Sequence, residues 1–85
     1  MAEVIVGLKV LPKDVNINLD KLEEKIKAAI NPEKIDREPI AFGLVAFHVV
    51  KFVLDAGGEM EKVEKKLKEI EEVGEVEVTG ISRSL

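Results

Sequence analysis

Few residues in this chain have side chains that could carry out catalysis or bind a metal. The chain contains no Cys, which excludes disulfides, thiolate metal sites and Cys nucleophiles together. Its single His, His48, lies among apolar neighbours, and such a histidine is more often a satisfied sheet residue than a ligand or a base. Gly57 and Gly58 lack the Lys-Ser/Thr continuation of a phosphate-binding loop, and Glu59 would repel phosphate. The sequence therefore predicts no metal, no cofactor and no enzymatic activity.

Two further kinds of site are disfavoured. An acylphosphatase-type loop after the first strand would need Gly and Arg, but residues 11–14 read LPKD. An RNA-binding sheet would need stacking aromatics on a basic surface. Phe47 or Phe52 could supply one ring, but 17 acidic residues against 13 basic ones give a net charge of −4. We therefore expect no direct contact with nucleic acid.

The segment from Glu38 to Gly43 (EPIAFG) is the most informative one. Phe42 lies three positions after Pro39 and directly before Gly43, which permits a tight reversal of the chain. One interpretation is that Phe42 caps the hydrophobic core. The other is that an aromatic side chain is presented at a sheet corner, where it would be the kind of anchor that dominates protein interfaces.

Length and composition define the setting of this segment. Eighty-five residues with 46% hydrophobic side chains make a single domain, residues 1–85, with a small aliphatic core. Charged residues make up 35% of the chain, and Gln is absent, a composition that resembles hyperthermophile proteins. No signal peptide or membrane-spanning run is visible, so we expect a cytoplasmic protein without a membrane partner.

Alternation and helical spacing predict the first three elements. Residues 3–11 alternate as a half-buried strand does, and residues 19–30 have apolar positions at helical spacing after Asn18, a good N-cap. Residues 33–41 give a weaker strand signal that contains Pro39. Because Pro cannot donate a hydrogen bond to a neighbouring strand, this strand should lie at a sheet edge.

The second half repeats this pattern. Residues 44–54 form the most apolar strand, although its periodicity does not show which face meets the helices. A turn is expected at residues 55–58 and a helix over residues 60–73, with Gly74 as the residue that ends it. Residues 75–78 alternate as a last strand that should end, or bulge, near Gly80.

The order strand, helix, strand, strand, helix, strand predicts an α+β fold. With right-handed crossovers it becomes a ferredoxin-like βαββαβ sandwich, with an antiparallel four-stranded sheet in the order 4-1-3-2 and two helices on one face. This topology places the second strand at the edge, which Pro39 independently requires.

At the Phe42 segment the sequence resembles the elongation factor 1-beta family of archaea. The motif EPIAFGL at residues 38–44 carries the resemblance, and its Pro-Ile-x-Phe-Gly core is shared with the eukaryotic exchange domain. The opening strand (residues 6–10) and the ending (residues 74–78) follow in the family's order. The resemblance spans the whole chain.

The resemblance implies guanine-nucleotide exchange on elongation factor 1-alpha, with GDP and GTP bound by that partner. It implies two groups of partner-binding residues. Phe42, with Pro39, Ile40 and Gly43, would contact the second domain of the GTPase. The carboxyl-terminal tail, with Ser82 and Arg83, would approach the magnesium and the nucleotide phosphates. Eukaryotic relatives have a Lys next to the end; here the tail has no Lys, and Arg83 is its only cation.

Two other functions stay open at this point. One is a ferredoxin-like module that binds a small effector or dimerises through its open sheet face. The other is an enzyme of acylphosphatase type. Co-purification with a GTPase would favour exchange, an effector-dependent change of oligomeric state would favour the module, and turnover of acyl phosphate would favour the enzyme.

Overall fold

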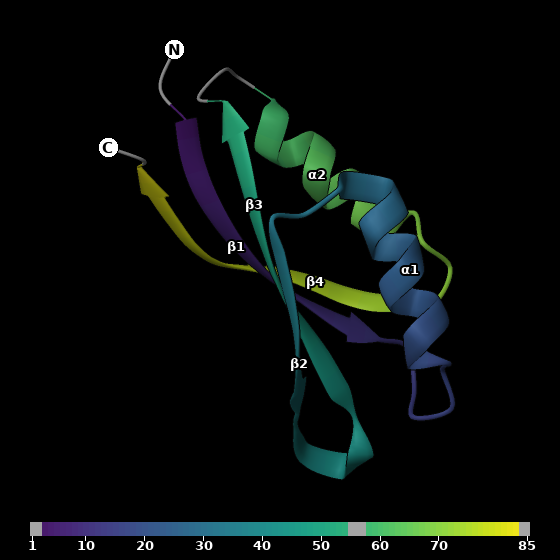
Figure 1. Cartoon of the computed structure of the whole chain (residues 1–85). Helices are drawn as coiled ribbons and strands as arrows, with labels where there is room; N and C mark the ends of the chain where they lie inside the picture. Colours follow the sequence, from purple (N-terminus) through teal and green to yellow (C-terminus); the bar gives the residue numbers. More distant parts are fainter. Residues whose placement is uncertain (1–2, 55–57, 84–85) are drawn as a thin grey trace.

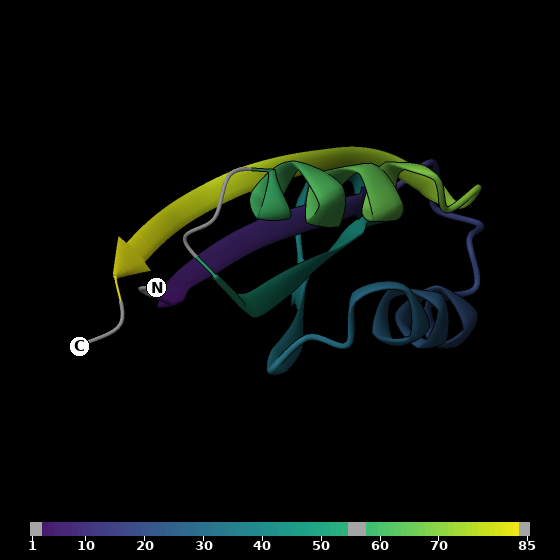
Figure 2. The ribbon, with the colours of Figure 1, turned by 90° about the horizontal axis from the view of Figure 1, so that it is seen from above.

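The chain folds into one antiparallel sheet and two helices, and the computed structural model describes residues 3–54 and 58–83. The strands are ordered β2-β3-β1-β4, which is the predicted order 4-1-3-2, and both helices pack on one face (Figures 1 and 2). The predicted ferredoxin-like α+β fold is therefore confirmed. The elements in chain order are β1 (Glu3–Pro12), α1 (Leu19–Ile30), β2 (Lys34–Pro39), a short turn η1 (Ala41–Gly43), β3 (Val45–Leu54), α2 (Glu59–Lys68) and β4 (Val73–Arg83).

The hydrophobic core lies between the helices and one face of the sheet. Even-numbered residues of β1 from Val6 to Val10 are at most 1% exposed. On β3 the core residues are the odd-numbered Phe47, Val49 and Val53, so this face meets the helices, a point that periodicity left open. The helices contribute buried side chains at helical spacing: Leu22, Ile26, Ile30, Val63 and Leu67.

Helix α1 begins and ends where the sequence predicts. The Asn18 side chain accepts a hydrogen bond from the Lys21 backbone N–H (3.0 Å), which satisfies one of the donors that a helix leaves unpaired at its start. At the other end Asn31 adopts a left-handed conformation and donates its N–H to the Lys27 carbonyl (2.9 Å). In the part of the chain that the structure describes, neither helix is long and apolar enough to cross a membrane.

Helix α2 is shorter than predicted: it ends at Lys68, whereas the prediction placed its end near Val73. The prediction that Gly74 ends this helix is wrong, since Gly74 lies inside β4. Lysines fill the last turn, whereas glutamates begin at Glu69, and carboxylates are unfavourable at the negative end of a helix. Of the predicted turn at residues 55–58, residues 55–57 lie outside the described residues, and Gly58 has the positive φ (+91°) of a turn glycine.

Strand β4 is longer than predicted: of the two outcomes expected near Gly80, a strand end is wrong, whereas a bulge is confirmed by the register shift at Thr79. Residues beyond Gly80 stay paired with β1: Ser82 lies opposite Ile5, and Arg83 lies opposite Val4. The register shifts by one residue at two places, where Thr79 and Gly74 are the extra residues of β4. The strand therefore follows the sheet along its full length in an arched course (Figure 2).

The edge strand β2 is fastened to α1 by Arg37. Its Nη2 lies 2.7 Å from Asp20 Oδ1, its Nε donates to Glu23 Oε1 at 3.0 Å, and its guanidinium lies 5.6 Å from the centre of the Phe47 ring. The hydrogen bond from Arg37, followed by that from Lys27, holds the pKa of Glu23 below its ordinary value. Arg37 thus holds the β2–β3 hairpin in a fixed orientation against the helix layer.

Candidate protein-binding site

The β2–β3 hairpin ends in a tight corner at residues 40–44. The Ile40 N–H donates to the Leu44 carbonyl at 2.8 Å, and the Leu44 N–H donates to the Ala41 carbonyl at 3.4 Å. Between them Phe42 and Gly43 both have left-handed backbones, with φ of +64° and +77°. A left-handed conformation suits Gly43, since Gly has no Cβ.

Phe42 points into solvent from this corner, with 93% of its surface exposed. The interpretation that Phe42 caps the core is therefore wrong. A left-handed backbone costs a residue with a side chain about 1–2 kcal/mol, and Phe42 recovers almost nothing by burial within its own fold. Strained residues of this kind cluster at functional sites, so the corner is the first candidate site.

The neighbours of Phe42 lead the chain into the corner. Pro39 is the last residue of β2 and pairs with Val45 on β3. The predicted edge position of this Pro is confirmed, because β2 is the outermost strand on its side of the sheet. Ile40 is half-buried and supplies the N–H that closes the corner. Pro39, Ile40, Phe42 and Gly43 are thus brought together, as predicted.

Ser82 and Arg83 lie at the other end of the sheet. They pair with the start of β1, whereas the beginning of β4 pairs with Pro12 at its end. Pro12 is eight positions after Val4, a span of about 26 Å along an extended strand. The predicted site residues therefore form two groups at opposite ends of the molecule, the hairpin end and the end that carries both chain termini (Figure 1).

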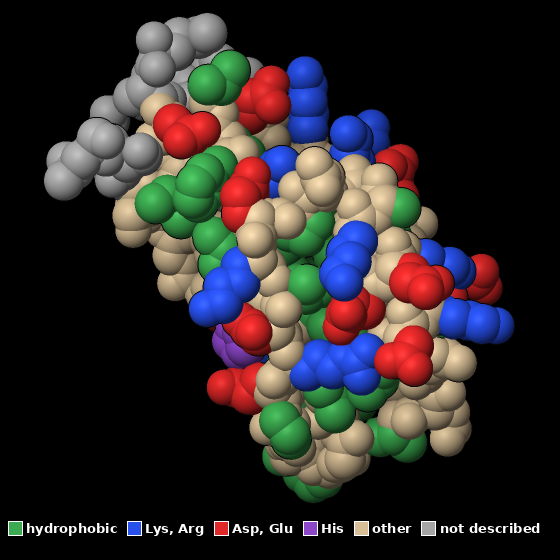
Figure 3. All heavy atoms as spheres, in the orientation of Figure 1, with side chains coloured by type: hydrophobic (Ala, Val, Ile, Leu, Met, Phe, Trp, Pro, Cys, Tyr) green, Lys and Arg blue, Asp and Glu red, His purple; other side chains and the backbone are tan. Residues whose placement is uncertain are grey.

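Charges between these two ends are mixed. On the open face of the sheet, His48 Nε2 lies 2.9 Å from Glu38 Oε1, which confirms the prediction of a satisfied sheet histidine. This hydrogen bond holds the pKa of Glu38 below its ordinary value. Figure 3 shows acidic and basic side chains alternating above a hydrophobic lower tip. Among the described residues, no three His, Asp or Glu side chains gather as metal ligands would.

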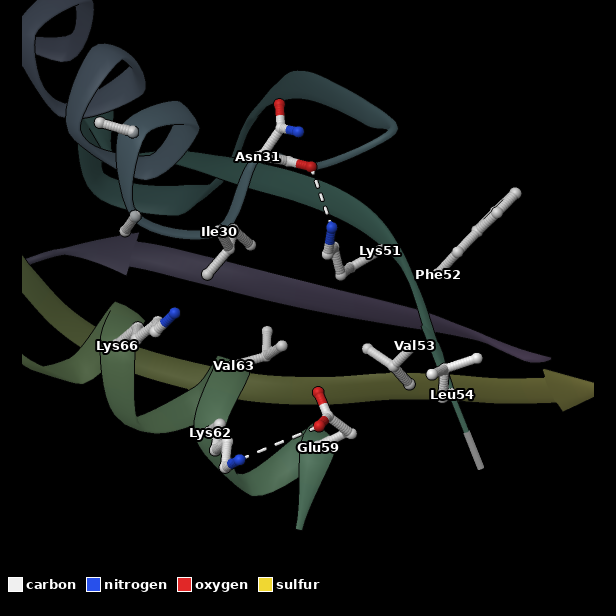
Figure 4. Close-up of a pocket in the computed structure, with 12 residues that line it drawn as sticks. Ile30, Asn31, Lys51, Phe52, Val53, Leu54, Glu59, Lys62, Val63 and Lys66 are labelled. Atoms are coloured by element: carbon white, nitrogen blue, oxygen red, sulfur yellow. Dashed lines mark hydrogen bonds and ion pairs between the residues drawn. The ribbon is translucent and has the colours of Figure 1, made fainter. Parts of the chain in front are cut away.

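A groove of about 410 Å³ lies between the end of α1, the end of β3 and the start of α2. Its lining is mixed: apolar side chains such as Ile30, Val53 and Val63 stand beside three lysines, Lys51, Lys62 and Lys66 (Figure 4). Two of these lysines make polar contacts within the protein. Lys51 Nζ donates a hydrogen bond to the Asn31 carbonyl (3.1 Å), and Lys62 forms an ion pair with Glu59 (3.9 Å). Among the lining residues that the structure describes, Glu59 is the one carboxylate, and none is a His. A small effector, if the chain bound one, would fit here.

One exposed apolar residue near the corner was missed by sequence reasoning. Val15 lies in the β1–α1 loop and is 58% exposed. An ideal Cβ at Gly43 would lie 3.7 Å from Val15 Cγ1, so the loop borders the corner. The only signal in the sequence is an apolar residue among polar neighbours.

Fold and site together define a small domain of ferredoxin-like type whose candidate protein-binding site is an exposed aromatic ring on a left-handed corner. A family model described as the EF-1 guanine nucleotide exchange domain matches residues 5–83, a span that includes both groups of site residues. The chain belongs to this exchange-domain family.

Curated relatives agree with the family model. The chain is 49% identical to the elongation factor 1-beta of Pyrococcus abyssi, with 93% of each chain covered. It is 43% identical to that of Methanothermobacter thermautotrophicus, with 98% of each covered. The elongation factor 1-beta of Pyrococcus furiosus is 45% identical over 89% of each chain. The predicted resemblance to archaeal elongation factor 1-beta is therefore confirmed, and the thermophilic relatives match the composition.

Proposed function

We propose that this chain, residues 1–85, promotes the replacement of GDP by GTP on elongation factor 1-alpha during translation elongation in the cytoplasm. The single observation that carries the proposal is the 93% exposed, left-handed Phe42 inside a chain of the exchange-domain family. The chain acts by binding the GTPase, which itself holds the nucleotide and the magnesium, and it catalyses no bond-breaking step. No nucleic acid or membrane is contacted.

The two groups of site residues take different parts in this function. Pro39, Ile40, Phe42 and Gly43 form the anchoring contact, with the Phe42 ring as the part that enters a pocket of the GTPase. The segment 82–83 forms the second contact, near the magnesium and the phosphates of the nucleotide. Because β4 stays paired with β1 as far as Arg83, the sheet carries this segment as a stiff extension of the domain.

Binding alone is sufficient for exchange. If this chain and GDP each weaken the other's binding to the GTPase, the coupling between them is reciprocal. The chain therefore needs only to bind the nucleotide-free GTPase more tightly than the GDP-bound form. A cation brought to the magnesium site competes for the ligands that hold the diphosphate, and incoming GTP then displaces the chain.

The test is release of fluorescently labelled GDP from elongation factor 1-alpha, with and without the chain. Phe42→Ala should weaken binding by about 2 kcal/mol, which is roughly a 30-fold rise in Kd. Arg83→Ala should leave Kd nearly unchanged and slow GDP release at saturating concentration. Glu64→Gln on the solvent face of α2 is the control and should behave as wild type.

Each outcome is informative. If the Phe42→Ala variant releases GDP at the wild-type rate, the corner is not part of the interface. Wild-type rates with Arg83→Ala would mean that exchange comes from distortion of the GTPase through other contacts. If the wild-type chain neither binds the GTPase nor releases GDP, and a small ligand changes its oligomeric state, the effector-binding module is the correct function and the groove at the end of α1 is its site.

A further inference from the structure

Two exposed apolar residues that are distant in the sequence are carried by neighbouring segments at the hairpin end. Val15 on the β1–α1 loop and Phe42 on the β2–β3 corner are 58% and 93% exposed. Gly43 joins them, because the position of an ideal Cβ on this residue is 3.7 Å from Val15 Cγ1. We call Val15 and Phe42 the two-segment corner. Phe52, Leu54 and Ile81, the other large apolar side chains exposed in the described residues, belong to the far half of the sheet.

The loop that carries Val15 is held in place on both sides. The Lys13 N–H donates to the Glu72 carbonyl at 2.9 Å, which ties the start of the loop to the approach of β4. The Asn16 N–H donates to Asp14 Oδ1 at 2.8 Å, a local turn that surrounds Val15. Asn18 then caps α1. The exposed position of Val15 is therefore fixed before any partner arrives, which lowers the entropy cost of binding through it.

Gly74 allows this placement. A Cβ at Gly74 would lie 3.0 Å from both the Pro12 carbonyl oxygen and Lys13 Cα, which are backbone atoms that cannot rotate away. Gly74 is also the extra residue where the register of β4 shifts. A side chain at residue 74 would force the Pro12–Lys13 backbone to shift, so Gly favours this close approach of β4 to the start of the loop.

We propose that Val15 is a second anchor for elongation factor 1-alpha, binding beside Phe42 in one apolar depression of the GTPase. This inference rests on the proposed function and extends its interface to a second chain segment. The partner follows from continuity: a protein that covers the 93% exposed Phe42 ring also meets the side chain next to Gly43. Lys13 and Asp14 provide a polar rim around the apolar centre, an arrangement typical of interface anchors.

The experiment measures Kd for nucleotide-free elongation factor 1-alpha by calorimetry or interferometry, with GDP release in parallel. Val15→Ala should raise Kd about five- to tenfold, the effect of losing part of a buried valine. Val15→Thr keeps the shape of the side chain and should also raise Kd, which separates apolar contact from loop geometry. Glu64→Gln on α2, outside both proposed contacts, is the control and should bind as wild type.

A double-mutant cycle tests the shared depression. If both side chains enter it, the loss in Val15→Ala/Phe42→Ala should be smaller than the product of the two single losses. Thermal unfolding should be the same for all variants, because neither side chain is buried. The inference is overturned if Phe42→Ala weakens binding while Val15→Ala and Val15→Thr bind as wild type. If Phe42→Ala also binds as wild type, the proposed anchoring contact fails together with it.

Discussion

Replacing Phe42 by Gly should make the free domain more stable and its binding to the partner weaker. The left-handed backbone at this position (φ +64°) is the cause of the first effect, because Gly adopts that conformation without a steric cost. The loss of an exposed ring causes the second. Substitutions rarely remove an aromatic side chain and raise stability together, so the combination is diagnostic.

The size of the change in the free energy of unfolding follows from the exposure of Phe42 and from its backbone conformation. With Phe42 93% exposed, only about 15 Å² of its surface is buried in the fold, worth about 0.4 kcal/mol at 25 cal/mol per Å². Relief of the left-handed strain returns about 1–2 kcal/mol. The greater freedom of Gly in the unfolded chain takes back part of that gain. The net increase in the free energy of unfolding should be about 0.5–1 kcal/mol.

Guanidinium chloride unfolding measures this increase. At a slope of about 2–3 kcal/mol per molar for a domain of this size, the midpoint should rise by about 0.2–0.5 M with the slope unchanged. Phe42→Ala keeps the strain and loses only the ring, so its midpoint should stay within about 0.2 M of wild type. If both variants are destabilised by more than 1 kcal/mol, the ring packs on its own fold and the reasoning about a presented anchor is refuted.

Three further predictions concern stability. Glu64→Gln removes an exposed ion pair of 3.8 Å on α2 and should cost only a few tenths of a kcal/mol in chemical denaturation; a loss above 1 kcal/mol would contradict this. Gly74→Ala should lower the free energy of unfolding by about 1–3 kcal/mol, whereas Gly80→Ala, whose Cβ would meet nothing within 4 Å, should cost much less. The pKa of Glu23 is lowered in the folded state, chiefly by its hydrogen bond from Arg37, so its contribution to stability is present above the ordinary pKa of 4.5 and is lost as the pH falls through the lowered value. Unfolding midpoints measured across acidic pH should therefore fall less steeply for Glu23→Gln than for wild type.

Sequence patterns predicted the sheet order and the first helix because each depends on local chemistry. Alternation fixed the core face of β1, Asn18 fixed the start of α1, and Pro39 fixed the edge position of β2. The predicted end of α2 was wrong, because Gly74 after a helical pattern was interpreted as a helix stop; the strand end expected at Gly80 was wrong, because the strand continues past a bulge there. At Gly74 the requirement is the close approach of a distant loop, which only the tertiary structure reveals.

The candidate site was predicted in part. The motif indicated Phe42, but its exposure depends on two successive left-handed residues that no propensity identifies for a Phe. Val15 could not be predicted, because its importance comes from its distance to Gly43, 28 positions later in the chain. The corner and Ser82 are far apart because β4 continues past Gly80 and pairs Ser82 with Ile5 near the start of β1. The sequence does not reveal this pairing.

The two register shifts in β4 also affect how the molecule behaves at high concentration. An outer strand of 11 residues offers a long row of unpaired backbone groups that could recruit another chain and start aggregation. The extra residues Gly74 and Thr79 divide this row into two stretches, residues 75–78 and 80–83, each too short to template a stable intermolecular sheet. Deleting Thr79 would keep Gly80 opposite Gly7 but join the stretches into one continuous edge. The irregularity that bends the strand is thus also a feature of the kind by which proteins discourage edge-to-edge pairing.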